Sequence, residues 1–176
     1  TPLPQKIDGL KSRLTDYADI EYLFMDTMHV SEPESEKLTV RHLEILLAEN
    51  PLDLVIASDD AALDFVLKNR SRFFEGIPVV FEGVNSEEKA RLASRDQQIS
   101  GIAEVLPLRE TVELAAHLLP HAKRVVSITD GTASSEGFLV QLGTCKAAFP
   151  NLKFVNLDCS KYSKAALTAK IGGRDN

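Results

Sequence analysis

The chain has 176 residues, of which 44% are hydrophobic, and its 20 basic and 26 acidic side chains give a net charge of −6. This apolar content argues against a disordered tail, and the length fits one domain or one and a half small lobes. The basic residues are dispersed, with no run of four, which argues against nucleic-acid binding and against binding to anionic lipid surfaces. No apolar run approaches the roughly eighteen residues of a membrane span. Thr1 is not a natural start, so we expect a piece of a longer protein.

Hydrophobic periodicity predicts an alternation of helices and strands along the whole chain. In chain order, the predicted elements are helix Gln5–Leu14, strand Ile20–Asp26, a helix from the Ser31 capping box to Asn50-Pro51, strand Asp53–Ser58, helix Ala61–Asn69, strand Pro78–Val84, helix Ser86–Ser94, strand Ile99–Val105, helix Arg109–Leu119, strand Arg124–Thr129, helix Ser134–Phe149, strand Leu152–Leu157 and helix Lys164–Ile171. Such alternation predicts an α/β fold whose parallel sheets have right-handed crossovers and helices on both faces.

Two local patterns refine this prediction. The strand Asp53–Ser58 is a nearly unbroken apolar run, which is typical of a strand buried on both faces of a parallel sheet. The alternation is interrupted at Glu104–Leu108, where Pro107 lies. We therefore predict a first lobe over residues 1–106, lacking an initial strand, and a partial second lobe over residues 107–176.

Polar residues gather where the predicted strands end, and open parallel sheets bind ligands beyond these carboxyl ends. Ser58 and Asp59 follow one strand and are the stronger ligand-binding candidates, whereas Asp60 is predicted to cap the following helix. Glu82 either contacts a ligand or has a satisfied structural role, since a buried unpaired carboxylate is costly. Asn85 either caps the next helix or faces the ligand.

Cofactor and metal signals are weak. Neither of the glycine-rich phosphate-binding motifs is present, and the four histidines form no recognisable metal motif, so we predict no cofactor and no metal. Cys145 and Cys159 match no zinc spacing. They are interpreted as two small buried hydrophobic residues, with a disulfide as the alternative.

The run DLVIASDDAALDFVLKNRSRFFEGIPVVFEGVN, residues Asp53–Asn85, resembles the type I periplasmic-binding-protein-like fold. It is most similar to the version that serves as the extracytoplasmic sensor of bacterial histidine kinases and related signalling proteins. Further matching pieces are Asp26-Thr27, Ile99–Glu104, Leu118–Thr132 and Ser134–Gly137. Family members usually begin with one more strand and continue for several more strand–helix units, so the resemblance implies a nearly complete first lobe and a truncated second lobe.

The resemblance implies a sensor domain without catalytic activity, which holds a small molecule between its two lobes. The residues it implies for ligand binding are Asp26, Thr27, Ser58, Asp59, Glu82, Asn85, Asp130 and Thr132. It also implies a membrane-anchored parent protein with this domain on the periplasmic or extracellular face, and a homodimer is possible. Three alternatives stay open: a free substrate-binding protein of an ABC transporter, an enzyme using Asp59, Asp60 or Glu82, and a phosphoacceptor receiver domain.

Overall fold

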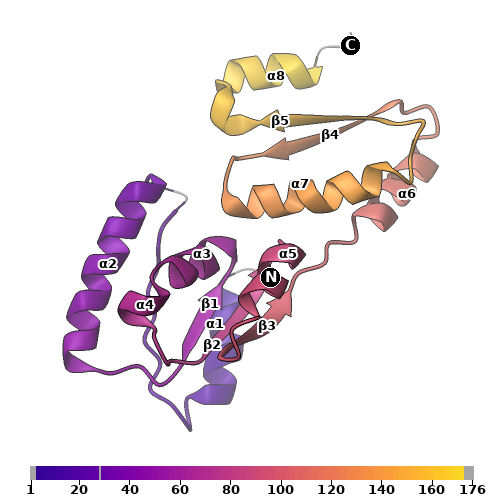
Figure 1. Ribbon diagram of the computed structural model, residues 1–176. Coiled ribbons are helices and arrows are strands. Elements are labelled where there is room, and N and C mark those ends of the chain that lie inside the picture. The colour runs from indigo at the N-terminus through magenta and orange to yellow at the C-terminus, as the bar shows by residue number, and fades with distance from the viewer. Residues whose placement is uncertain (1–2, 28, 173–176) are drawn as a thin grey trace. The chain divides into compact units, whose positions relative to one another are not determined.

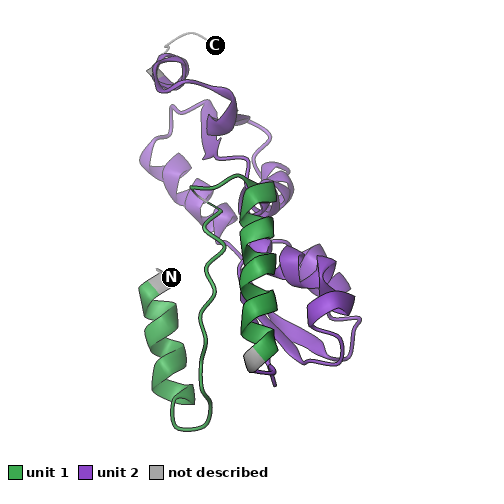
Figure 2. Cartoon of the chain, turned by 90° about the vertical axis from the view of Figure 1, so that its left-hand side faces the viewer, with its two compact units in different colours: residues 1–49 green, residues 50–176 purple. Residues whose placement is uncertain are grey.

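The computed structural model of the chain describes residues 3–27 and 29–172 and divides into two compact units, residues 1–49 and 50–176 (Figures 1 and 2). Unit 1 contains α1 (Leu3–Leu14) and α2 (Glu32–Glu49). Unit 2 contains all the described strands. No described helix is long and apolar enough to cross a bilayer.

The predicted strand Ile20–Asp26 is wrong. This segment of unit 1 has no regular secondary structure, and it belongs to neither of the sheets found in the described residues. A strand is stable only when a neighbouring strand completes its backbone hydrogen bonds. The segment is instead held by a side chain: the hydroxyl of buried Ser35, in the first turns of α2, donates a hydrogen bond to the carbonyl of Met25.

The first sheet of unit 2 consists of three parallel strands, β1 (Val55–Ser58), β2 (Val79–Val84) and β3 (Ile99–Ala103), in the order β1-β2-β3. They are connected by α3 (Asp60–Lys68), the short α4 (Arg70–Phe73) and α5 (Glu87–Ala93). Because the strand order follows the chain order, right-handed crossovers place α3 and α5 on one face of the sheet. The buried residues between them include Leu63, Phe65, Val66, Phe74, Val79, Phe81, Ala90 and Ala93.

The two faces of this sheet differ. Val79 and Phe81 of β2 are buried, whereas Val80 between them is 39% exposed and Ile102 of β3 is 75% exposed. The expectation that Asp53–Ser58 is buried on both faces is therefore wrong, since of β1 only Ala57 is fully buried. Gly83, with φ +68, lies at an irregularity in the β2–β3 register. This bulge returns Val84 to the buried set instead of leaving it beside Val80.

The second sheet consists of two parallel strands, β4 (Arg124–Thr129) and β5 (Lys153–Asp158). Helix α6 (Leu108–Leu118) precedes β4, and α7 (Ala133–Lys146) connects the two strands. After β5 come the 3₁₀ helix η1 (Cys159–Lys161) and α8 (Lys164–Gly172).

The α/β class with parallel sheets flanked by helices is confirmed, and each predicted element other than Ile20–Asp26 is present. The lobe boundary predicted at residue 107 falls between the two sheets. The division into compact units falls elsewhere, at residue 50, so the lobe boundary stays a prediction. Both cysteines are free. Cys145 is buried as predicted, but the prediction that Cys159 is buried is wrong, since it is only partly buried.

Arg70 ties together the end of the first sheet that lies opposite the strand tips. Its guanidinium donates hydrogen bonds to the carbonyls of Phe74 and Ile77, the latter at 2.6 Å, and to Gln98 Oε1 at 3.0 Å and Asp96 Oδ2 at 3.2 Å. The backbone N–H of Gln98, and then Arg70, lower the pKa of the Asp96 carboxyl below its ordinary value. One side chain therefore connects α4 to the segments that enter β2 and β3.

We expect Arg70→Met to reduce the free energy of unfolding by about 2–3 kcal/mol, because hydrogen bonds from a charged, largely buried donor are lost and carbonyls are left unsatisfied. Urea denaturation measures the loss. Arg91→Met on the exposed surface of α5 is the matched control and should change stability by no more than about 0.5 kcal/mol. Equal effects of the two substitutions would contradict the structural role given to Arg70.

Candidate functional site

The turn from β1 into α3 is capped by Asp59, not by Asp60 as the sequence predicts. The backbone N–H of Asp59 extends the ladder by donating to the carbonyl of Glu82 at 2.9 Å. The Asp59 carboxylate then accepts a hydrogen bond from Ala62 N at 3.1 Å, as an N-cap does. The ladder therefore persists one residue beyond Ser58, which moves the cap position from the second aspartate to the first.

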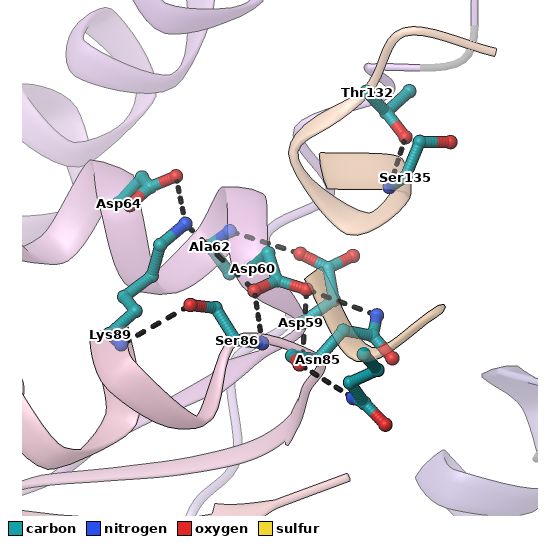
Figure 3. Close-up of polar contacts among 10 residues, drawn as sticks. Asp59, Asp60, Ala62, Asp64, Asn85, Ser86, Lys89, Thr132 and Ser135 are labelled. Atoms are coloured by element: carbon teal, nitrogen blue, oxygen red, sulfur yellow. Dashed lines mark hydrogen bonds and ion pairs between the residues drawn. The ribbon is translucent and has the colours of Figure 1, made fainter. Parts of the chain in front are cut away.

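Asp60 is fully buried and binds the neighbouring strand end (Figure 3). Its Oδ2 accepts hydrogen bonds from the backbone N and the side-chain Nδ2 of Asn85, at 3.0 and 3.1 Å, and its Oδ1 accepts one from Ser86 N at 3.4 Å. Lys89 Nζ lies 3.8 Å from Asp60 Oδ1 and 2.6 Å from Asp64 Oδ2. We call Asp60, Asn85, Ser86 and Lys89 the Asp60 network. It joins the β1–α3 turn to the β2–α5 turn.

Ser58 and Glu82 form a second pair at the same edge. They are register partners on adjacent strands, and the Ser58 hydroxyl donates a hydrogen bond to Glu82 Oε1. Their side chains alternate with Ala57 and Phe81, which are buried. Ser58 and Glu82 therefore lie on the sheet face opposite α3 and α5, while Asn85 is held on the helix-bearing side.

Asp59 has an unusual backbone conformation, with φ 90° and ψ 176°. Residues other than glycine rarely adopt this region, and holding one there costs about 1–3 kcal/mol. The side chain of Asp59 is nevertheless exposed at the strand tip. Strain of this kind at an exposed polar residue is a feature of ligand-binding sites, where it holds a side chain in a required direction.

The second sheet presents a comparable group at the end of β4. Asp130 Oδ1 accepts hydrogen bonds from Ser135 Oγ at 2.5 Å, Thr132 Oγ1 at 2.7 Å and Thr132 N at 3.1 Å. The Ser135 and Thr132 hydroxyls lower the pKa of the Asp130 carboxyl. Thr132 also caps α7 by accepting from Ser135 N at 3.3 Å. The sequence prediction placed Asp130 and Thr132 at this strand end, and the structure adds Ser135.

A further polar group that the sequence analysis missed follows β5. Asp158 Oδ1 accepts hydrogen bonds from Ser160 Oγ at 2.6 Å and Ser160 N at 3.0 Å, and Lys161 Nζ lies 3.0 Å from Oδ2. The Ser160 hydroxyl, followed by Lys161, lowers the pKa of Asp158. The signal available in the sequence was an aspartate directly after a predicted strand with serine two positions later, the pattern of an Asx turn.

The strand ends of the two sheets are brought into one region by α7. This helix contacts α3, and a side chain at Gly137 would lie 2.7 Å from Asn85 Cβ. Figure 3 accordingly draws Thr132 and Ser135, at the start of α7, together with Asp59 and Asn85. Asp59 and Asp130 can accept hydrogen bonds from ligand N–H, O–H or ammonium groups.

Asp26 and Thr27 belong to unit 1, and their place in a ligand site stays a prediction. Asp26 has φ +51, and its Oδ1 lies 2.6 Å from Nδ1 of His29. The hydrogen bond to Asp26, together with its charge, raises the pKa of the His29 imidazole. Both side chains are largely exposed.

Comparison with known proteins supports the fold. No family model and no curated protein matches the chain. A solved structure described as a conserved domain protein from Vibrio cholerae is similar, with 22% sequence identity and a TM-score of 0.55. The similarity covers 72% of this chain and 42% of that protein, so the matched region is less than half of its length. It defines the present chain as an α/β protein with helix-flanked parallel sheets.

We expect Asp60→Asn to reduce the free energy of unfolding by about 2–4 kcal/mol, because an amide N–H₂ would face the N–H donors of Asn85 and Ser86 in a buried site. The matched control is Asp64→Asn, which removes the closer carboxylate partner of Lys89. The Asp64 side chain is 47% exposed, so Asp64→Asn should reduce the free energy of unfolding by less than about 1 kcal/mol. Urea denaturation compares them, and a larger effect at Asp64 would refute the Asp60 network.

We expect Ser135→Ala to raise the pKa of Asp130 toward its ordinary value, since the strongest hydrogen bond to the carboxylate is removed. Carboxyl ¹³C NMR titration measures this change, and Ser134→Ala is the neighbouring control. The pKa of Asp130 is lowered in the folded state, so its contribution to stability is present above the unfolded pKa of about 3.9 and is lost as the pH falls through the folded value. An unchanged Asp130 titration in Ser135→Ala would contradict the hydrogen-bond assignment.

Proposed function

We propose that this chain is the ligand-binding part of an extracytoplasmic sensor domain in a membrane-bound signal-transduction protein, such as a histidine kinase. One observation carries the proposal: polar groups at the carboxyl ends of two parallel sheets, Asp59 after β1 and the Asp130–Ser135 loop after β4, are gathered in one region by α7. Carboxyl ends of parallel strands are where open α/β sheets bind ligands.

The conformation of Asp59 supports binding at this edge. The chain keeps an aspartate where glycine would be free of strain, and the carboxylate stays exposed. The Asp60 network holds the residue next to Asp59 in place, because buried Asp60 is hydrogen-bonded to Asn85 and Ser86. A rigid inner shell beneath an exposed polar group is the arrangement expected where a ligand must be held in a defined orientation.

In the proposed mechanism, donor groups of a small molecule bind Asp59 on the first sheet and the Asp130–Thr132 loop on the second. A ligand that contacts both halves stabilises their closed arrangement over the open one by its differential affinity. The change in this equilibrium is the signal, which the membrane-bound parent transmits from the periplasmic or extracellular face. No bond of the ligand is made or broken in this mechanism.

A thermal-shift screen of the protein against amino acids and other small molecules that carry ammonium or N–H donors tests the proposal. A ligand at 100 times its Kd should stabilise the fold by about 2.7 kcal/mol. We expect Asp59→Gly to lose this ligand-dependent shift while keeping or raising the ligand-free Tm, because glycine relieves the backbone strain and costs only a few tenths of a kcal/mol as a cap.

Asp53→Ala, an exposed change before β1, serves as the control and should keep the ligand-dependent shift. If Asp59→Gly and Ser58→Ala both leave the Kd of a discovered ligand unchanged, the site is wrong. The sensor role has a separate test in the parent gene. An encoded protein with neither an export signal nor a membrane span would exclude it.

A further inference from the structure

The side chain of Gln141, on α7, hydrogen-bonds to backbone groups of three separate segments. Its Nε2 donates to the carbonyl of Asn85, after β2, at 2.7 Å and to the carbonyl of Glu104, after β3, at 2.9 Å. Its Oε1 accepts from the N–H of Leu106 at 2.9 Å. Leu106 lies in the segment that connects the first sheet to α6. Both amide hydrogens and the amide oxygen of Gln141 are thus used.

Gly137 lies one helical turn before Gln141, on the same face of α7. A Cβ atom at residue 137 would lie 2.7 Å from Asn85 Cβ, 2.9 Å from Asn85 C and 3.0 Å from Ser86 N. These distances are too short for a real side chain, so α7 reaches the Asn85–Ser86 backbone only because residue 137 is glycine. Gly143, on the same helix, has no atom within 4 Å of its Cβ position.

These contacts end on residues that are themselves held in place. The backbone N and side-chain Nδ2 of Asn85 both donate to the buried carboxylate of Asp60. A continuous set of contacts therefore runs from Asp60 through Asn85 to Gly137 and Gln141, and on to Leu106. We call Gly137 and Gln141, with their partners Asn85, Glu104 and Leu106, the α7 contact.

We infer that the α7 contact fixes the orientation of the second sheet relative to the first, with Gln141 as the positioning residue. By holding the start of α7 against the end of β2, it sets the separation between Asp59 and the Asp130–Thr132 loop. This inference goes beyond the proposed function and needs no ligand. If the proposed function is right, the α7 contact is the pivot of the change between open and closed arrangements.

The α7 contact can open without disrupting either core. Its hydrogen bonds come from one polar side chain, and Glu104 and Leu106 are not buried, so water can replace Gln141 at these groups. Of the three buried residues of α7, only Gly137 belongs to the α7 contact, whereas the apolar Leu142 and Cys145 do not. The hydrogen bond to Glu104 is exposed, and those to Asn85 and Leu106 are partly buried. Local opening of a few hydrogen bonds of this kind is a motion that proteins make without global unfolding.

The test uses the complete chain without ligand, with Gln141→Ala and Val140→Ala compared by NMR. In Gln141→Ala we expect the amide of Leu106 to exchange about tenfold faster or more, while the amides within β1–β3 and β4–β5 keep their protection. Residual dipolar couplings of the two sheets should fit one alignment tensor in the wild type and two in Gln141→Ala. Val140 is an exposed neighbour on α7, and its replacement should leave both measurements unchanged.

Two further comparisons keep the inference testable if Gln141→Ala does not fold. Gln141→Glu keeps an acceptor for Leu106 N–H but loses both donors, so it should keep the Leu106 protection and still loosen the orientation of the sheets. Gly137→Ala should lower the Tm while Gly143→Ala raises it, although helix propensity alone predicts a rise for both. A single tensor in both Gln141 variants, or a rise in Tm for both glycine replacements, would overturn the α7 contact.

Discussion

The buried carboxylate of Asp60 is the interaction on which the rest of unit 2 depends. Two parallel strands that lie side by side do not by themselves fix the turns that follow them. Asp60 does so by accepting hydrogen bonds from Asn85 and Ser86 at the end of the neighbouring strand, with Lys89 compensating its charge. Because a buried carboxylate without these donors is costly, the two turns are held in one arrangement.

That arrangement separates two roles at the carboxyl edge of the first sheet. Asp59, left at the surface by the turn, has the strained backbone and the exposed carboxylate that suit ligand binding. Asp60, one residue later, has none of its surface exposed and acts only within the protein. Adjacent aspartates therefore serve different purposes because the chain turns between them. The buried side chain of Asp60, at the first position of α3, reaches the β2–α5 turn, whereas the side chain of Asp59 stays at the surface.

The link between the two sheets depends on the same strand end. Asn85 is bound by Asp60 on one side and is approached by Gly137 and Gln141 on the other. The contacts that stabilise the first sheet and those that we infer to orient the second sheet therefore both end at Asn85. A ligand held between the strand ends would change the arrangement of the two lobes to the extent that it binds one arrangement more tightly than the other.

The sequence by itself determined the alternation of helices and strands, the parallel α/β class and the grouping of polar residues at strand ends, because these follow from local periodicity and turn chemistry. It could not exclude a strand at Ile20–Asp26, since an apolar run becomes a strand only beside a partner. It also assigned the cap of α3 to Asp60 instead of Asp59, because one additional ladder hydrogen bond decides which residue caps the helix. Only the tertiary structure decided that Asn85, Gly137 and Gln141 meet, since contacts between residues more than fifty positions apart leave no periodic signal in the chain.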